Sequence, residues 1–244
     1  MKQFLLPEDC PEELDLTGAD FHYLRTVRRL GEGDAFAGID PAGNMFHVAV
    51  LQVAEGKMRV QLIPAGKPKP DMPAVHLYQC LPKGGKFDQV IRMATEAGVS
   101  KITPVISQYT QVKLSQQDEK KKADRWQRVV QEAVQQSGSP HVPKICAVRN
   151  LGELVNEAGE MLFFHQAPIA TKTLHDYCSR ITGEIGIVIG PEGGFSSEEV
   201  EKMTRAGWKA AYLGPWVLRT EHAGLYAIAA VQTMLLERDS WKIQ

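Results

Sequence analysis

The sequence predicts an α/β protein whose larger part is a parallel sheet covered by helices, preceded by a smaller domain of short β-strands. After residue 72, apolar runs of strand length alternate with helical patterns, which is typical of a parallel sheet with helices on both faces. Before it, the apolar runs are short and are separated by turns. Between these parts lies "IPAGKPKPDMPAVH" (residues 63–76), whose four prolines and two lysines are typical of a linker. We therefore predict two domains, residues 1–72 and 73–244.

The smaller domain contains three predicted strands, at residues 34–40, 44–53 and 57–63. Turn residues separate the three runs, and residues 40–44 have the composition of a hairpin loop. Several short strands with regular turns favour a small β-barrel.

The larger domain alternates predicted strands with helices. Helical spacing of apolar residues predicts one helix within residues 86–98, with Gly98 as its stop, and a longer one over residues 118–136. Trp126, Val129, Val130, Ala133 and Val134 form the apolar face of the longer helix. Strands are predicted at residues 75–81, 101–107, 144–148, 160–165, 184–190 and 209–214.

The overall composition excludes several classes of protein. A net charge of −1 provides no global basic field, so any nucleic-acid binding must come from a local patch. The four cysteines form no C-x-x-C pair and the seven histidines show no metal-ligand spacing, so we expect neither a zinc site nor a disulfide framework, and no metal. No segment approaches the roughly 18 apolar residues of a membrane span, and the N-terminus is too acidic for a signal peptide. We expect a cytoplasmic protein with reduced thiols and no membrane contact.

Two glycine-containing bends stand at the ends of predicted strands. The first, in "IGPEGGFSSEEVEKM" (residues 189–203), leads into a helix whose start is marked by the capping box of Ser196 and Glu199. The second, in "LGPWVLRTEHAGLYAIAAVQTMLLE" (residues 213–237), leads into a long apolar helix, for which Thr220 is the predicted N-cap. Glycines at the carboxyl end of a parallel strand allow a ligand to approach the backbone. Tight structural turns, with Arg219 as an ordinary ion-pair partner and Glu221 as a helix-dipole complement, are the alternative interpretation.

Known nucleotide-binding and hydrolase motifs are absent from the chain. There is no G-x-G-x-x-G, no G-x-S-x-G, and "PKGGKFD" departs from a P-loop because Phe87 follows Lys86. Most histidines are interpreted as ordinary surface or core residues. His165 is the exception, because it ends a strand that shares the predicted ligand edge with both bends.

The motifs "IGPEGGFSSEEV", "LGPWVLRTEHAGLYAIAAVQ", "KGGKFDQVIRMATEAGVSKITPVISQYTQVK" and "HYLRTVRRLGEGD" resemble the ribosomal RNA small subunit methyltransferase E family. The resemblance covers essentially the whole chain in order. It implies a SPOUT-type C-terminal domain with a trefoil knot, although knots are otherwise close to absent in proteins, and an N-terminal PUA-like β-barrel that binds RNA.

The resemblance also implies a cofactor and a reaction. S-adenosyl-L-methionine is expected to lie bent between the two bends. The residues implied to line its site are Phe164, His165, Gly190, Glu192, Gly194, Leu213, Gly214 and Leu218. The expected reaction is methylation of N3 of a specific uridine in 16S rRNA of the small ribosomal subunit, which requires an unpaired base. Arg219 is the candidate for orienting the base and stabilising its anion, and Glu221, or alternatively Glu192, is the candidate proton acceptor.

RNA contacts are expected from local basic groups in both domains, and the apolar last helix is expected to help form a homodimer with the catalytic pocket between subunits. The predicted RNA-binding residues are His22, Arg25, Arg28, Arg29, Lys83, Lys86 and Lys113. The run "EKKKADRWQR" is interpreted as an exposed helix face.

Three positions depart from the family pattern. Trp216 replaces a basic residue, His222 replaces a threonine, and Ser139–Pro140 stands where an arginine is frequent. Loss of the positive groups at Trp216 and at Ser139–Pro140 is expected to change the affinity for RNA or the identity of the target. Trp216 offers a surface on which a base can stack instead. A SPOUT enzyme acting on a ribose 2′-oxygen or another base, and a non-catalytic RNA-binding relative, are the alternative functions. The intact Arg219 and Glu221 favour an enzyme.

Overall fold

The computed structural model describes residues 3–67, 72–139, 141–156 and 159–238. The chain divides into two compact units: Met1–Lys69 with Val134–Val142, and Pro70–Ala133 with Pro143–Gln244. The predicted boundary near residue 72 adjoins residues outside the described ranges, and the assignment of domains 1–72 and 73–244 stays a prediction.

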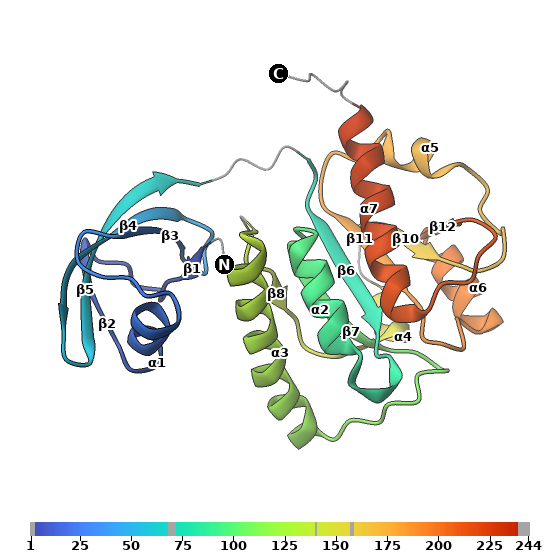
Figure 1. Cartoon of the computed structure of the whole chain (residues 1–244). Helices are drawn as coiled ribbons and strands as arrows, with labels where there is room; N and C mark the ends of the chain where they lie inside the picture. The colour runs from blue at the N-terminus through green and yellow to red at the C-terminus, as the bar shows by residue number, and fades with distance from the viewer. Residues whose placement is uncertain (1–2, 68–71, 140, 157–158, 239–244) are drawn as a thin grey trace. The chain divides into compact units, whose positions relative to one another are not determined.

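The first unit is built on a curled five-stranded sheet (Figure 1). Its strands follow the order β1-β3-β4-β5-β2. Their bounds are β1 Phe4–Leu5, β2 Glu13–Thr17, β3 Ala35–Ile39, β4 Met45–Ala54 and β5 Lys57–Gly66. β1 runs parallel to β3 and the other pairs are antiparallel. The three predicted strands are confirmed, whereas β1 and β2 were not predicted from the sequence.

Local side-chain chemistry fixes the turns of this sheet. The predicted hairpin loop between β3 and β4 is confirmed, because the carboxylate of Asp40 accepts hydrogen bonds from the backbone and side-chain N–H groups of Asn44, at 2.8 and 2.6 Å. After β2 the chain forms α1 (Gly18–His22), which continues as a π-helix, η1 (Tyr23–Val27). Its exit bends at Arg29, whose positive φ of 60° is unusual for a residue other than glycine.

The second unit contains a seven-stranded sheet in which every pairing is parallel. The strand order is β12-β10-β11-β6-β7-β8, and β9 also pairs with β7. The bounds are β6 Val75–Cys80, β7 Lys101–Ile106, β8 Lys144–Ile145, β9 Arg149–Asn150, β10 Glu160–Phe164, β11 Ile185–Ile189 and β12 Lys209–Ala211. All six strands predicted after residue 72 are present, with shorter ends. The predicted parallel α/β fold is therefore confirmed.

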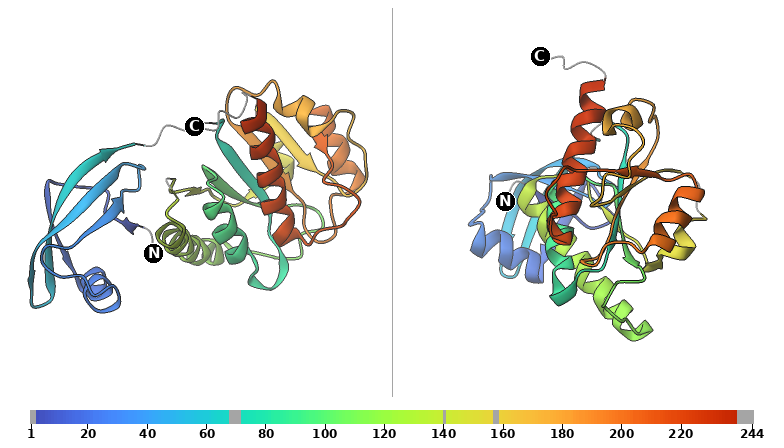
Figure 2. Two further views of the ribbon diagram at one scale, coloured as in Figure 1. Left: turned by 45° about the horizontal axis from the view of Figure 1, so that its top comes forward. Right: turned by 90° about the vertical axis from the view of Figure 1, so that its right-hand side faces the viewer.

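Helices cover both faces of this sheet, with α2 and α7 on one side and α4 and α6 on the other (Figure 2). The bounds are η2 Lys83–Gly85 (a 3₁₀ turn), α2 Phe87–Glu96, α3 Gln116–Ser137, α4 Leu151–Leu154, α5 Leu174–Cys178, α6 Ser197–Arg205 and α7 Thr220–Arg238. The predicted apolar face of α3 is buried, and its Trp126 packs edge-on against Phe87 of α2, with ring centroids 4.7 Å apart. None of the helices within the described residues has the length and apolarity needed to cross a membrane.

The sheet presents different residues to its two helical layers because strand side chains alternate. Tyr78 and Cys80 of β6, with Val188 of β11, belong to one buried cluster that also includes Met203 and Trp208. The intervening residue of β6, Gln79, is buried on the opposite side, where its amide hydrogen-bonds to the first residue of α7. A polar side chain thus stands in the core next to the two bends.

Candidate functional site

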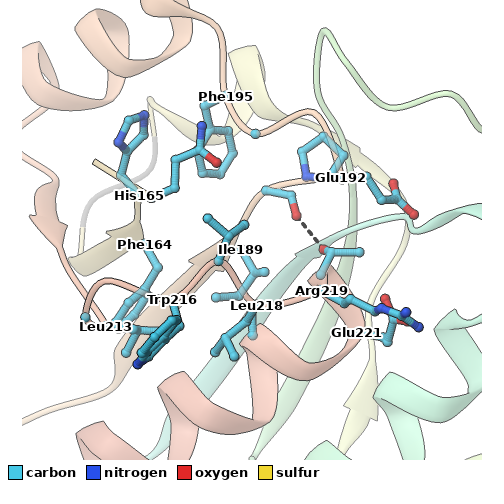
Figure 3. A pocket seen from close by; sticks show the side chains of 18 of the residues that line it. Phe164, His165, Ile189, Glu192, Phe195, Leu213, Trp216, Leu218, Arg219 and Glu221 are labelled. Carbon is cyan, nitrogen blue, oxygen red and sulfur yellow. Dashed lines mark hydrogen bonds between the residues drawn. The ribbon is translucent and has the colours of Figure 1, made fainter. Parts of the chain in front are cut away.

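One cavity of the second unit, here called the main cavity because the two bends meet at it, opens at the carboxyl ends of β10, β11 and β12, where open α/β sheets bind their ligands (Figure 3). Its volume is about 430 Å³, within the range of small-molecule sites. Segments far apart in the sequence line it: residues 164–166, the first bend (residues 190–195), the second bend (residues 213–219), the start of α7, and Lys86. Charged Glu192, Arg219 and Glu221 lie toward one side, and Phe164, His165, Leu213 and Trp216 toward the other (Figure 3).

The first bend is held by its own backbone and by the predicted helix cap. Gly194 has φ +71° and its N–H donates to the carbonyl of Pro191 at 2.9 Å, which closes the turn. A Cβ atom at Gly190 would lie 3.3 Å from the ring of Phe195, so a side chain there would press on that ring. Both bonds of the Ser196–Glu199 capping box are present, which confirms the predicted start of α6. Glycine and the cap together fix where the chain enters and leaves the bend.

The second bend depends on Gly214, whose φ of +112° is a conformation that other residues rarely adopt. The chain then runs over the cavity rim, where Trp216 is 82% exposed and Val217 is also exposed, before it turns down into α7. A large indole with so little contact of its own at a cavity rim is available to a ligand.

A hydroxyl group joins the two bends. Thr220 donates a hydrogen bond to the carbonyl oxygen of Gly190 at 2.5 Å, drawn as the dashed line in Figure 3. The side-chain amide of Gln79 donates in turn to the same hydroxyl at 3.0 Å. The sequence predicted Thr220 as the N-cap of the last helix, and that role is wrong: Thr220 is the first residue of α7 and its hydroxyl bonds across to the first bend. The local pattern resembled a cap because both uses require a small hydroxyl side chain at a helix start.

Glu221 is a buried carboxylate, only 3% exposed. Its Oε1 accepts a hydrogen bond from the Lys86 ammonium at 2.8 Å, and this bond is the main cause that holds the pKa of Glu221 below its ordinary value, against the opposing effect of burial. Its other oxygen, Oε2, has no hydrogen-bond partner within the described residues. A buried charged oxygen without a hydrogen-bond partner is costly to the free energy of folding.

Glu192 is also an acceptor, but an exposed one. Its Oε1 accepts the backbone N–H of Lys83 at 2.9 Å, which ties the first bend to the loop after β6. Glu192 therefore has a structural role in positioning the bend besides any role in chemistry.

The structure brings the predicted cofactor residues together. All eight line the main cavity: Phe164, His165, Gly190, Glu192, Gly194, Leu213, Gly214 and Leu218. Arg219 and Glu221, the predicted catalytic residues, line it as well. His165 is partly buried, and its Nδ1 accepts the backbone N–H of Ala167 at 3.1 Å. The functions assigned to these ten residues stay predictions, while their common location is a finding.

Sequence reasoning missed several residues of the cavity. Lys86 was predicted to bind RNA, which stays a prediction, and the structure adds that its ammonium pairs with Glu221 inside the site. Ile189, Pro191, Phe195 and Thr220 also contribute to the walls. The one available signal for Lys86 was the basic turn "KGGK" after a strand that neighbours β11.

The other predicted RNA-binding residues lie outside the main cavity. Lys83 and Lys113 are exposed in the second unit. His22, Arg25, Arg28 and Arg29 belong to the first unit, on α1, η1 and the residues after it. They differ in availability: Arg25 donates to the carbonyl of Leu30 at 3.0 Å, and Arg28 is partly buried with Nη1 unpartnered among the described residues.

The departures from the family pattern have different environments. Ser139 is buried, and its hydroxyl donates to the carbonyl of His141 at 3.0 Å, so it serves local structure. His222 is exposed, as is Trp216. Pro140 lies outside the described residues. Across the described ranges, no three His, Cys, Asp or Glu side chains converge as metal ligands would.

Comparison with known proteins places this geometry in a family. The profile of the RNA methyltransferase domain matches residues 69–232. The ribosomal RNA small subunit methyltransferase E of Bacillus subtilis (strain 168) is 31% identical over 251 residues, covering 95% of this chain and 94% of that protein.

Solved structures resemble the whole chain as well. A structure from Legionella pneumophila in complex with the bound cofactor SAM has a TM-score of 0.84 at 28% identity, covering 95% of this chain and 97% of that one. The ribosomal RNA small subunit methyltransferase E from Neisseria gonorrhoeae, bound to S-adenosyl methionine, has a TM-score of 0.82 at 28% identity, covering 96% and 98%. The match extends over both units and includes the segments that line the main cavity. The chain therefore belongs to the ribosomal RNA small subunit methyltransferase E family.

Proposed function

We propose that this protein is an S-adenosyl-L-methionine-dependent methyltransferase that methylates N3 of a specific uridine in 16S rRNA of the small ribosomal subunit. One observation carries the proposal: two glycine bends from separate parts of the chain line a single cavity together with the Arg219 side chain. The proposed function is also supported by the family of the chain and by related structures that contain S-adenosyl methionine.

The residues of the main cavity fit the cofactor. Adenosine requires apolar walls and a few backbone hydrogen-bonding groups, and these are supplied by Phe164, Ile189 and Leu218 and by the partly exposed backbone at Gly190 and Gly214. When bound there, S-adenosyl-L-methionine would supply an electrophilic methyl group on a positively charged sulfonium. Phe164, His165, Gly190, Glu192, Gly194, Leu213, Gly214 and Leu218 are the residues proposed to hold it.

The charged side of the cavity suits a uracil base. N3 carries a weakly acidic proton on the Watson–Crick edge, so the base must enter the site unpaired. Arg219, which is exposed at the cavity, stabilises the negative charge that develops when the proton leaves. The unpartnered Oε2 of Glu221 accepts the N3–H hydrogen bond and orients the base. The lowered pKa of Glu221 keeps this carboxylate ionised, so it is always an acceptor at neutral pH.

Transfer of the N3 proton has two candidate acceptors. Glu221 is favoured because one of its oxygens is unpartnered and buried in the wall of the cavity. Glu192 is the alternative, reached directly or through water. Much of the rate would come from alignment of the base with the methyl donor, because holding two reactants in line removes a large entropic barrier.

The fold assignments that go beyond a parallel α/β sheet belong to the same proposal. We infer that the first and second bends are parts of a trefoil knot of the SPOUT type, supported by their joint lining of one cavity. We infer that the curled five-stranded sheet of the first unit is a PUA-like barrel that binds RNA, supported by the exposed basic residues His22, Arg25 and Arg29 beside it in sequence. Lys83 and Lys113 would add phosphate contacts from the second unit.

A homodimer is proposed from the last helix. Ala227, Ile228 and Val231 of α7 are buried within the chain, whereas Leu225 and Tyr226 of the same helix are exposed. Apolar side chains exposed on an otherwise apolar helix are typical of an interface. The protein would act in the cytoplasm, where small ribosomal subunits are found.

Nucleoside mapping of 16S rRNA tests the proposed function. rRNA from cells that lack the gene should lose one N3-methyluridine, and the unchanged gene should restore it while an Arg219→Ala gene should not. Persistence of every N3-methyluridine in the deletion strain would contradict the target. Loss of a 2′-O-methyl or another methylated base would identify a different SPOUT activity, and no change in any nucleoside would favour a non-catalytic relative.

A further inference from the structure

A second cavity, here called the Tyr109 cavity, adjoins the main cavity across the first bend. Its volume is about 460 Å³ and its walls include Lys83, Gln108, Tyr109, Gln111, Glu192 and Gly193. Glu192 lines both cavities, so a single loop separates them. The Tyr109 cavity lies at the carboxyl ends of β6, β7 and β11, which neighbour one another in the sheet. It thus continues the same ligand-binding edge.

The backbone of the Tyr109 cavity is held in place by carboxylates. Glu192 accepts the N–H of Lys83 at 2.9 Å, and Glu199 accepts the N–H of Gln108 at 2.7 Å. A Cβ atom at Gly193 would lie 3.1 Å from the Cβ of Tyr109, so the glycine backbone packs directly against the tyrosine. The position of Tyr109 is therefore coupled to the first bend, which borders the main cavity.

Several side chains of the Tyr109 cavity face solvent and have no partner among the described residues. Tyr109 is 46% exposed. Gln108, Gln111 and Lys83 are exposed, and within the described ranges their side chains make no hydrogen bond or ion pair. One aromatic ring, two amides and one ammonium are thus available side by side in a hollow with a fixed backbone.

These groups match the chemistry of a nucleotide in single-stranded RNA. An aromatic ring stacks on a base whatever its sequence, amides hydrogen-bond to the edges of unpaired bases, and a lysine pairs with a phosphate. The Glu192 carboxylate repels a phosphate, so the phosphate is expected at Lys83 and the base on Tyr109. We propose that the Tyr109 cavity binds the nucleotide next to the target uridine in the rRNA strand, a role that rests on the proposed function.

Steady-state kinetics with small ribosomal subunits from cells lacking the gene test this assignment. Tyr109→Ala should raise the KM for subunits about 5- to 150-fold, the range expected for loss of one stacked base. The KM for S-adenosyl-L-methionine should stay within twofold, which also shows that the variant is folded. Tyr109→Phe keeps the ring and should recover most of the lost affinity.

The cation is tested by salt dependence. Lys83→Gln should reduce the slope of log affinity against log salt for 16S rRNA by about 0.7, the value for one phosphate contact in a single strand. Its backbone N–H, which holds Glu192, is unchanged by the substitution. Lys121→Gln is the matched control, because Lys121 is an exposed lysine of α3 outside both cavities, and it should leave the slope unaltered.

Several results would overturn the subsite. The subsite is contradicted if the KM of Tyr109→Ala for small subunits stays within twofold of that of the unchanged protein. It is also contradicted if the KM for S-adenosyl-L-methionine rises as much as the KM for subunits, because the effect then lies in the main cavity. If the unchanged protein transfers no methyl group to subunits, the proposed function fails. In that case the affinities of Tyr109→Ala and Tyr109→Phe for 16S rRNA alone test the subsite. Weaker binding by the alanine variant only would support it, and equal binding by both variants would contradict it.

Discussion

The hydroxyl of Thr220 donates a hydrogen bond of 2.5 Å to the carbonyl oxygen of Gly190, and thereby ties the start of the last helix to the first bend. The two residues are 30 positions apart, and both line the main cavity. Gln79 completes the arrangement from β6, where it lies opposite Ile189 in the sheet register. This buried network links the two loops that line the main cavity.

Removal of the Thr220 hydroxyl should loosen both bends. Thr220→Val keeps the shape but leaves the Gly190 carbonyl and one N–H of Gln79 without partners, which is expected to cost about 1–3 kcal/mol in the free energy of unfolding. Affinity for S-adenosylhomocysteine should fall roughly tenfold, because we expect about 1.4 kcal/mol of that cost to be needed to hold the two bends in the binding position. Urea unfolding and calorimetry measure the two quantities. Thr220→Ser retains the hydroxyl and should match the unchanged protein in the free energy of unfolding and in the affinity for S-adenosylhomocysteine. If Thr220→Val also matches the unchanged protein in these two quantities, the network is contradicted.

Lys86 should stabilise the fold in a pH-dependent way. Its hydrogen bond lowers the pKa of Glu221 from an ordinary value of 4.5, so the stabilisation is present above that pH and is lost as the pH falls through the lower folded-state pKa. Lys86→Met removes the bond and leaves burial to raise the pKa of Glu221. We expect a cost of about 1–2 kcal/mol at pH 7, less than the roughly 3–5 kcal/mol of a fully buried pair, because the Lys86 side chain is 41% exposed.

The same variant should approach the unchanged protein in acid. At pH 4 Glu221 of Lys86→Met becomes protonated in the folded state, which removes the unpaired buried charge. Urea unfolding at pH 7 and pH 4 compares the two conditions, with Lys86→Arg as the charge-preserving control. An equal cost at both pH values would show that the ion pair does not set the ionisation of Glu221.

Arg219 should be needed for methyl transfer more than for cofactor binding. Loss of a group that stabilises charge in the transition state lowers kcat by about 100- to 1,000-fold in comparable sites. Arg219→Ala should therefore lose that factor in methylation of small subunits, while its affinity for S-adenosylhomocysteine changes less than threefold. Arg219→Lys keeps the charge without the planar fork and should be intermediate. Methylation by the alanine variant at close to the original rate would remove Arg219 from the mechanism.

The second bend should be sensitive to its glycine. Apart from its chain neighbours, no atom of the described residues lies within 4 Å of a Cβ built on Gly214, so Gly214→Ala is disfavoured by its φ of +112° alone. The strain is worth about 1–3 kcal/mol, and we expect it to appear as weaker binding of S-adenosylhomocysteine or as lower stability. Gly152→Ala is the matched control: it lies in α4, has an ordinary φ and open space around it, and should be neutral or slightly stabilising.

Local chemistry explains why much of the fold was predictable. The buried strands β6, β7 and β11 are apolar runs of strand length, and the Ser196–Glu199 cap is complete within four residues. By contrast, β1 has only two residues and no strand signal of its own, and the polar–apolar alternation of β2, ELDLT, is a short strand signal that was not recognised. Each exists because a neighbouring strand supplies the hydrogen bonds, and that partner is distant in sequence.

The same distinction holds in the site. Each bend was recognisable from its own glycines, and the family resemblance connected them. The pairing of Lys86 with Glu221 joins residues 135 positions apart, and Gln79 reaches Thr220 over 141 positions. No spacing in the sequence encodes such contacts, so Lys86 was predicted on an RNA surface and Thr220 in a helix cap.

A crystal structure of the protein with S-adenosylhomocysteine tests most directly the claim that both bends form one cofactor site. We predict that the ligand lies in the main cavity, in contact with the backbone of the first bend at Gly190 and of the second bend at Gly214. A ligand found elsewhere on the chain, or a main cavity left empty at saturating ligand, would contradict the account.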